Sequence, residues 1–274
     1  MMKKYLKMIG NIMLYMFLYI VVSCLISLVV ALLVKNKDSL HWIRNNPSIL
    51  TIMINIPTLL VYMLIAKIRK QNFKVKYHFN SFNYHYIYLI ILIGISLGIF
   101  STSFLRIHII KENFSTLNKL LKSITAGDNL IITLLGTITM GSILEEVLFR
   151  GLIFEELKKN TNIIFAVIVQ GLLLGVFTLN ISAMIYAGIG GVIFGVIYIV
   201  FRSIWAAILA HMISSTVLLI FSKWSTNLIS EANAVYAAAL SIIILAASLY
   251  MILKYRNKIQ NENNIQTSTE QPSF

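Results

Sequence analysis

The sequence predicts an all-α membrane protein: a polytopic bundle of about eight transmembrane helices with one interfacial amphipathic helix. Hydrophobic residues make up 58% of the 274-residue chain and charged residues only 12%, which is far from the composition of a soluble domain. Each apolar run is close to the roughly 20 residues that cross a bilayer core. Three prolines and thirteen glycines suit long helices, and the alternation of a membrane barrel is absent from the sequence.

The apolar runs define the elements in order. The expected spans cover about residues 8–34, 47–66, 85–106, 129–156, 162–180, 183–201, 203–222 and 233–254. Residues 107–128 differ, because their apolar positions recur at helical spacing among lysines and a glutamate. This pattern indicates an amphipathic helix in the membrane interface, which either connects two spans or gates access to the next one.

This order of elements divides the chain into four regions. Residues 1–128 hold the first three spans and the interfacial helix, and residues 129–222 hold four spans joined by very short links. Residues 223–254 hold the last span. Residues 255–274 are polar and weakly patterned, so they are expected to form a disordered cytoplasmic tail.

The net charge of +13 raises the question of a nucleic-acid partner. Most lysines and arginines flank apolar runs instead of forming a basic stripe with stacking aromatics, which excludes nucleic acid and favours the lipid bilayer. Their distribution places both termini in the cytoplasm. The bias toward Ile, Asn and Lys is typical of an AT-rich bacterial genome, so the expected location is a bacterial plasma membrane.

A cluster of charge interrupts the fourth span. Glu145, Glu146 and Arg150 lie in an otherwise apolar run, where each charge near the bilayer centre costs about 2.5–3.5 kcal/mol. On a helix, Glu146 and Arg150 are four residues apart and share a face, whereas Glu145 lies about 100° away. Glu146 is therefore expected to pair with Arg150, and Glu145 is expected to activate a water molecule.

Other polar residues lie within or at the ends of these spans. His211 lies midway along an apolar span, where an ionisable residue indicates a functional site. Glu155 and Glu156, beside two lysines, are expected to form an interfacial charged face. Two glutamates and one histidine would suffice to hold zinc, but there is no His-Glu-x-x-His pair. The expectation is catalysis without a metal or other cofactor.

These residues resemble a known family. The stretch from Glu145 to Gly151 is similar to the Glu-Glu-x-x-x-Arg motif of the CPBP family, the CAAX proteases and bacteriocin-processing or self-immunity proteins also called Abi. The segments Gly191–Tyr198 and Ser203–His211 are similar to the family's later motif region. The resemblance covers about residues 129–222 and implies a helical intramembrane endopeptidase acting on a peptide or membrane-protein substrate.

The resemblance also implies roles and shows two departures. Glu145 would activate water, Glu146 and Arg150 would orient and neutralise the site, and His211 would stabilise the oxyanion. The family's second motif is Phe-x-x-x-His, and Thr178 stands at its histidine position. Its third motif is His-x-x-x-Asn, and Ser215 stands at the asparagine position. Thr178 can hold a water molecule but cannot act as a base near neutral pH.

Three functions follow from these observations. The first is an intramembrane peptidase that uses Glu145 and a reduced supporting set. The second, which the replacements at Thr178 and Ser215 favour, is a non-catalytic family member that binds a peptide, as a bacteriocin self-immunity or regulatory protein. The third is a transporter that uses the buried carboxylates as a proton relay.

Overall fold

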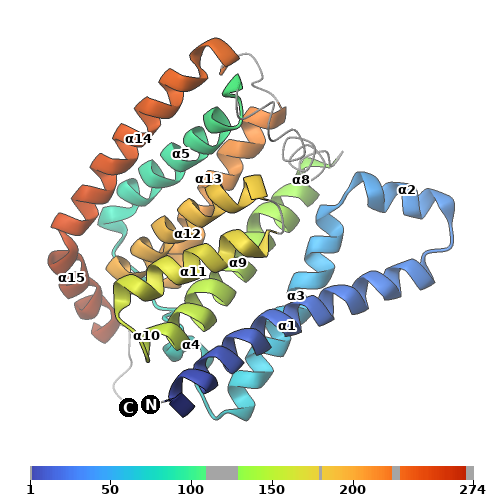
Figure 1. The fold of residues 1–274 in the computed structure, drawn as a ribbon, viewed down its shortest axis with the longest axis horizontal. Helices are drawn as coiled ribbons and strands as arrows, with labels where there is room; N and C mark the ends of the chain where they lie inside the picture. Colours follow the sequence, from blue (N-terminus) through green and yellow to red (C-terminus); the bar gives the residue numbers. More distant parts are fainter. Residues whose placement is uncertain (1, 109–128, 179–180, 224–228, 270–274) are drawn as a thin grey trace. The chain divides into compact units, whose positions relative to one another are not determined.

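The computed structural model describes most of the chain as helix (Figure 1). The described residues are 2–108, 129–178, 181–223 and 229–269. Every regular element within these ranges is helical, which confirms the predicted all-α class. The interfacial helix expected at 107–128 falls almost entirely outside the described residues.

Seven helices among the described residues are long and apolar enough to cross a membrane. They are Met2–Leu33, Ser48–Ile68, Tyr84–Phe104, Leu130–Lys158, Ala183–Phe201, Ile204–Phe221 and Glu231–Lys254. The one expected span that is missing from these seven, at residues 162–180, corresponds to α11 (Ile163–Phe177), an apolar helix of 15 residues among the described residues. This is shorter than the roughly 20 residues of a typical span. The chain is a multi-pass membrane protein.

The helices form two compact units, and each is described by itself. Unit 1 comprises Met1–Tyr77 and Lys122–Ala166, and unit 2 comprises His78–Leu121 and Val167–Phe274. The boundary at Ala166 falls within the segment 129–222 that the sequence grouped as one core.

Unit 1 is built around the long helix that carries the two glutamate pairs. Its elements are α1 (Met2–Leu33), α2 (Lys37–Asn45), α3 (Ser48–Ile68), α4 (Phe73–Lys76), α8 (Leu130–Thr133), η2 (Leu134–Met140), α9 (Gly141–Glu146), η3 (Val147–Phe154) and α10 (Glu155–Lys158). Helix α3 packs against α1 and against the segment from α8 to α9. The short helix α2 was not expected from the sequence, and the Asn36 side chain caps it by accepting from the amide of Asp38.

Unit 2 holds the remaining helices. They are η1 (Tyr84–Tyr86), α5 (Ile87–Phe104), most of α11, α12 (Ile181–Phe201), α13 (Ile204–Lys223), α14 (Glu231–Lys254) and α15 (Arg256–Thr269). Helix α5 packs against both α13 and α14, and the three run side by side in Figure 1. Two glycines allow α5 to approach α13: a Cβ on Gly94 would lie 2.8 Å from the Ala210 carbonyl oxygen, and one on Gly98 would lie 2.6 Å from the Val217 Cβ.

Glycines also bring α11 and α12 together. A Cβ on Gly171 would lie 2.7 Å from a Val192 methyl group, and one on Gly175 would lie 2.5 Å from the Met184 carbonyl oxygen. Cβ atoms do not approach other atoms this closely, so only glycine fits at these positions. Glycines four residues apart form the small-residue face at which membrane helices pack closely.

The C-terminal tail differs from the disordered segment expected at residues 255–274. Residues Arg256–Thr269 form α15, which a polar composition alone does not favour. Ile259 is fully buried, Gln260 Nε2 donates to the Ile199 carbonyl at 3.2 Å, and Asn83 Nδ2 donates to Glu262 Oε2 at 3.0 Å. One apolar anchor and two polar contacts within unit 2 therefore order this helix.

Candidate active site

The helix that carries Glu145 departs from regular α-helical geometry on both sides of it. Segments η2 and η3 are π-helical, and the α-helical stretch α9 lies between them. In η2 the Thr139 hydroxyl donates to the carbonyl five residues earlier, at Leu134, over 2.9 Å. Because π-helical turns re-aim the side chains beyond them and occur frequently at functional sites, this feature marks the glutamates independently of their charge.

Helix α3 holds this irregular segment in place. Asn55 Nδ2 donates to the Met140 carbonyl at 3.1 Å, and the hydroxyls of Ser48 and Thr137 are 2.7 Å apart. A Cβ on Gly136 would lie only 2.2 Å from the Ser48 carbonyl oxygen. Close packing and side-chain hydrogen bonds thus fix η2 against α3, just before the glutamate pair.

Glu146 and Arg150 form the ion pair expected from their spacing. Arg150 Nη1 lies 3.0 Å from Glu146 Oε1, and both side chains are fully buried. Charges removed from water in this way are tolerated when they neutralise each other. The predicted pairing is confirmed, and it assigns Glu146 a structural and electrostatic role within unit 1.

Glu145 has a different environment. It is partly exposed, in contrast to its buried neighbour Glu146. Its carboxylate interacts electrostatically with Arg150 and with Tyr19 of α1. Glu145 therefore lies beside a buried cation and a phenol while keeping access to the outside of unit 1, as the sequence expectation of a reactive carboxylate requires.

Tyr19 belongs to a group of tyrosines that the sequence reasoning missed. The Tyr62 hydroxyl of α3 donates to the Tyr15 carbonyl of α1 at 2.9 Å, and the two rings meet edge to face. Tyr19 lies near Tyr62 as well as near Glu145. The available signal was the spacing of Tyr15 and Tyr19, which are four residues apart in an apolar run and therefore share a helix face.

The remaining predicted residues lie in unit 2. His211 of α13 is partly exposed, and its ring stacks on Phe194 of α12 with centroids 4.7 Å apart and planes at 18°. Ser215 follows on α13 four residues later, so it shares a helix face with His211. The Thr178 hydroxyl donates to the Gly175 carbonyl at 2.7 Å, at the end of α11.

Gln170 is a buried polar residue of unit 2 that the sequence reasoning also missed. Its side chain is fully buried, and Nε2 donates to the carbonyls of Val167 at 3.0 Å and Gly191 at 2.8 Å. A Cβ on Gly195 would lie 2.6 Å from Gln170 Nε2. The glycines of α12 therefore admit a side chain that satisfies a backbone carbonyl of the neighbouring helix.

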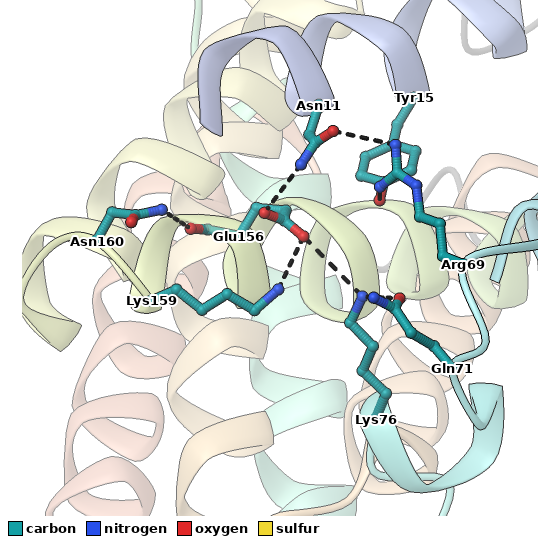
Figure 2. A network of polar contacts seen from close by, with 8 residues as sticks. All are labelled: Asn11, Tyr15, Arg69, Gln71, Lys76, Glu156, Lys159 and Asn160. Carbon is teal, nitrogen blue, oxygen red and sulfur yellow. Dashed lines mark hydrogen bonds and ion pairs between the residues drawn. The ribbon is translucent and has the colours of Figure 1, made fainter. Parts of the chain in front are cut away.

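Glu155 and Glu156, expected to form an interfacial charged face, are buried. They are 8% and 7% exposed. Glu155 Oε1 accepts from Lys158 at 3.4 Å. Glu156 Oε1 accepts from Lys159 at 2.8 Å, and Glu156 Oε2 accepts from Asn11 at 3.3 Å (Figure 2). Glu156 therefore joins α10 to α1, which a reading of charge alone does not show.

The predicted residues thus divide between the units. Glu145, Glu146 and Arg150 are brought together on one helix of unit 1, and His211 and Ser215 on one helix of unit 2. Thr178 lies in unit 2 in the turn that directly follows α11. Among the described residues, no three side chains of His, Cys, Asp or Glu form a group able to hold a metal ion.

Comparison with known proteins gives two matches. Residues 127–217 match the family described as type II CAAX prenyl endopeptidase Rce1-like. The protein named "Putative membrane peptidase YdiL" from Bacillus subtilis (strain 168) is 31% identical over 81 residues, which cover 30% of this chain and 33% of that protein. The chain thus spans about one third of the relative's length. No solved structure matches.

Proposed function

We propose that this protein, whose residues 127–217 match the family described as type II CAAX prenyl endopeptidase Rce1-like, is an intramembrane endopeptidase that hydrolyses a peptide bond with a glutamate-activated water. One observation carries the proposal. Within the matched segment, a fully buried Glu146–Arg150 pair adjoins the partly exposed carboxylate of Glu145. A carboxylate that is not the principal partner of the buried cation is suited to take a proton.

The proposed reaction assigns one role to each residue. Glu145 accepts a proton from water, and the resulting hydroxide attacks the peptide carbonyl carbon. The buried Glu146–Arg150 pair adjoins Glu145, and the family resemblance supports a role for this pair in orienting and neutralising the site. The tetrahedral intermediate collapses when the carbon–nitrogen bond breaks, and Glu145 returns the proton to the leaving amine.

His211 and Ser215 are proposed to act on the oxygen of the scissile carbonyl. The family resemblance supports His211 as the donor that stabilises the oxyanion. Ser215 follows on the same helix face and offers a hydroxyl where the family has an amide. Loss of one oxyanion donor costs about 100–1,000-fold in rate, so a slow enzyme is expected. Replacing Ser215 by Asn should then raise kcat.

The test is cleavage of hydrophobic, membrane-tethered peptides by the full chain reconstituted in lipid nanodiscs. In water enriched in ¹⁸O, the new C-terminal carboxylate should gain one ¹⁸O atom from the attacking water. Glu145→Gln should reduce the rate about 100–10,000-fold. A peptidase whose Glu145→Gln variant cleaves as fast as the wild type would exclude Glu145 as the base.

A second candidate function is non-catalytic peptide binding, as in an immunity or regulatory membrane protein. The observation that favours it is Thr178, which replaces the motif histidine and donates its hydroxyl to the Gly175 carbonyl of the preceding helix α11. This function predicts that Glu145→Gln leaves the protein's protective or regulatory effect in cells unchanged. The peptidase proposal predicts that the same variant abolishes the effect.

A further inference from the structure

An open pocket of about 480 Å³ lies in unit 1, apart from the glutamates of the proposed reaction. It is formed by the beginning of α1 and by the connection between α10 and α11. The residues that matter here are Lys4, Tyr5, Lys159, Asn160 and Phe165. Neither the sequence motifs nor the family resemblance assigns this pocket a function.

The ends of two membrane-spanning helices place the pocket at the level of the lipid headgroups. The helix Met2–Leu33 begins beside it and the helix Leu130–Lys158 ends beside it. Tyr5 is 40% exposed and Phe165 is 49% exposed. Exposed aromatic rings at helix ends are typical of the boundary between headgroups and acyl chains. Tyr5 and Phe165 therefore give the pocket an edge suited to lipid.

The charges that line the pocket are positive. Lys4 is exposed, and the Lys159 side chain is 47% exposed. Among the described residues that line the pocket, none carries a carboxylate. Two ammonium groups facing one open pocket at headgroup level attract an anion.

The nearest carboxylates are turned away into the protein and compensated there. The side chains of Glu155 and Glu156 are 11% and 10% exposed. Glu156 is surrounded by the network of Figure 2, in which Lys159 lies at 2.8 Å, Lys76 at 4.0 Å and Asn11 at 3.3 Å. Lys159 contacts this network and also lines the pocket, and its ammonium group has further N–H donors to offer.

A second part of the network adds more positive charge. Arg69 donates to the Tyr15 hydroxyl at 2.8 Å and to Asn11 Oδ1 at 3.0 Å, and Lys76 donates to Gln71 (Figure 2). Burial lowers the pKa of Lys76, and the neighbouring charge of Lys159 lowers it further. Four cations accompany the two carboxylates, namely Arg69, Lys76, Lys158 and Lys159, and Lys4 lines the pocket together with Lys159. This end of unit 1 therefore has an uncompensated positive charge.

We propose that this pocket binds the phosphate of an anionic phospholipid headgroup, with Lys4 and Lys159 as its ligands. Lys4 and Lys159 donate to the phosphate oxygens, and the rings of Tyr5 and Phe165 lie against the glycerol and the first acyl carbons. The net positive charge selects anionic over zwitterionic lipid. This site is independent of the proposed peptidase activity, because it uses none of its residues.

The experiment measures lipid retained by the full chain in detergent micelles. The protein is incubated with an equimolar mixture of phosphatidylglycerol and phosphatidylcholine, and bound lipid is counted by native mass spectrometry. The wild type should retain phosphatidylglycerol preferentially. Lys4→Gln should weaken that binding about fivefold, the contribution of one lysine near an anionic membrane surface. Lys4→Gln combined with Lys159→Gln should weaken it about 25-fold if the two act independently.

Matched controls separate a site from general surface charge. Lys35→Gln with Lys37→Gln removes two exposed lysines of unit 1 outside the pocket and should leave lipid retention unchanged. Since Lys159 also pairs with Glu156, the Lys4→Gln variant, which leaves the network of Figure 2 intact, tests the site without affecting the fold.

Three results would overturn the proposal. The first is equal retention of both lipids by the wild type. The second is an equal loss of phosphatidylglycerol from the pocket variants and the Lys35–Lys37 control. The third is stabilisation by millimolar inorganic phosphate, lost in Lys4→Gln, without any lipid preference, which would assign the pocket to free phosphate.

Discussion

Two adjacent glutamate pairs lie on the same helix of unit 1 in different surroundings. Glu145 and Glu146 lie in its apolar part, where Glu146 is fully buried against Arg150. Glu155 and Glu156 lie at its end, where each has a lysine within 3.4 Å and 2.8 Å, respectively. Glu155 has Lys158 beside it and Glu156 has both Lys159 and Lys76, whereas both carboxylates of the first pair interact with Arg150.

This difference separates structural from chemical roles. Glu156 pairs locally with Lys159, and its contacts with Asn11 of α1 and Lys76 of α4 fasten this helix to its neighbours. In the first pair, Glu146 holds Arg150 at 3.0 Å, while Glu145 is the partly exposed member. The Glu-Glu dipeptide therefore acts as an anchor at the end of the helix and as a proposed reaction centre in its middle.

The largest effect on stability is expected from breaking the buried pair. Arg150→Met leaves the Glu146 carboxylate without its cation in a fully buried position and should cost about 3–5 kcal/mol in the free energy of unfolding. Combining Glu146→Leu with Arg150→Met should recover most of that loss. The measurement is unfolding in mixed micelles with increasing dodecyl sulfate. A double variant as unstable as the sum of the two single variants would contradict the pairing.

A smaller loss is expected at the end of the helix. Glu156→Gln removes the charge that Lys159, Lys76 and Asn11 share and should cost about 1–2 kcal/mol, because Lys159 is half-exposed and solvent weakens its ion pair. The same unfolding assay measures it. A loss as large as that of Arg150→Met would show that the two glutamate pairs contribute equally to stability.

Glu155→Gln provides the matched comparison. Glu155 accepts from Lys158 at 3.4 Å, and the Lys158 side chain is 42% exposed. A partly solvated pair of this kind contributes about 0–1 kcal/mol. Glu155→Gln should therefore unfold at nearly the same dodecyl sulfate fraction as the wild type. A destabilisation that exceeds that of Glu156→Gln would contradict the central place of Glu156 in the network.

The smallest effect is a pH dependence from Lys76. Burial lowers the folded-state pKa of Lys76 below its unfolded value of about 10.4. Between the two pKa values the unfolded chain binds more protons, so the free energy of unfolding should rise with pH in that window. Lys76→Met should remove this rise when unfolding is compared at increasing alkaline pH. A variant that retains the full rise would assign it to another group.

Much of the fold was predictable because it depends on segment length and spacing. The apolar runs ended within a few residues of the helices Ser48–Ile68 and Glu231–Lys254, and the four-residue spacing of Glu146 and Arg150 predicted their ion pair. These features follow from local geometry. The catalytic roles of Glu145 and His211 remain predictions, because they depend on the reaction itself.

Features that depend on packing between distant segments were not predictable. The π-helical turns around α9 accompany contacts of η2 with α3, such as the bond from Asn55 to Met140. The helix α15 depends on burial of Ile259 in a polar segment. The sequence indicated only an interfacial charge at Glu156, because its partner Asn11 is 145 residues away in the chain.

The central claim is that Glu145 alone of these four carboxylates performs the proton transfer. The most direct measurement is the rate of peptide cleavage in nanodiscs by four single variants, in which glutamine replaces Glu145, Glu146, Glu155 or Glu156. The account predicts that Glu145→Gln loses about 100–10,000-fold in kcat with unchanged unfolding, while Glu155→Gln cleaves at the wild-type rate. Equal rates for Glu145→Gln and Glu155→Gln would contradict it.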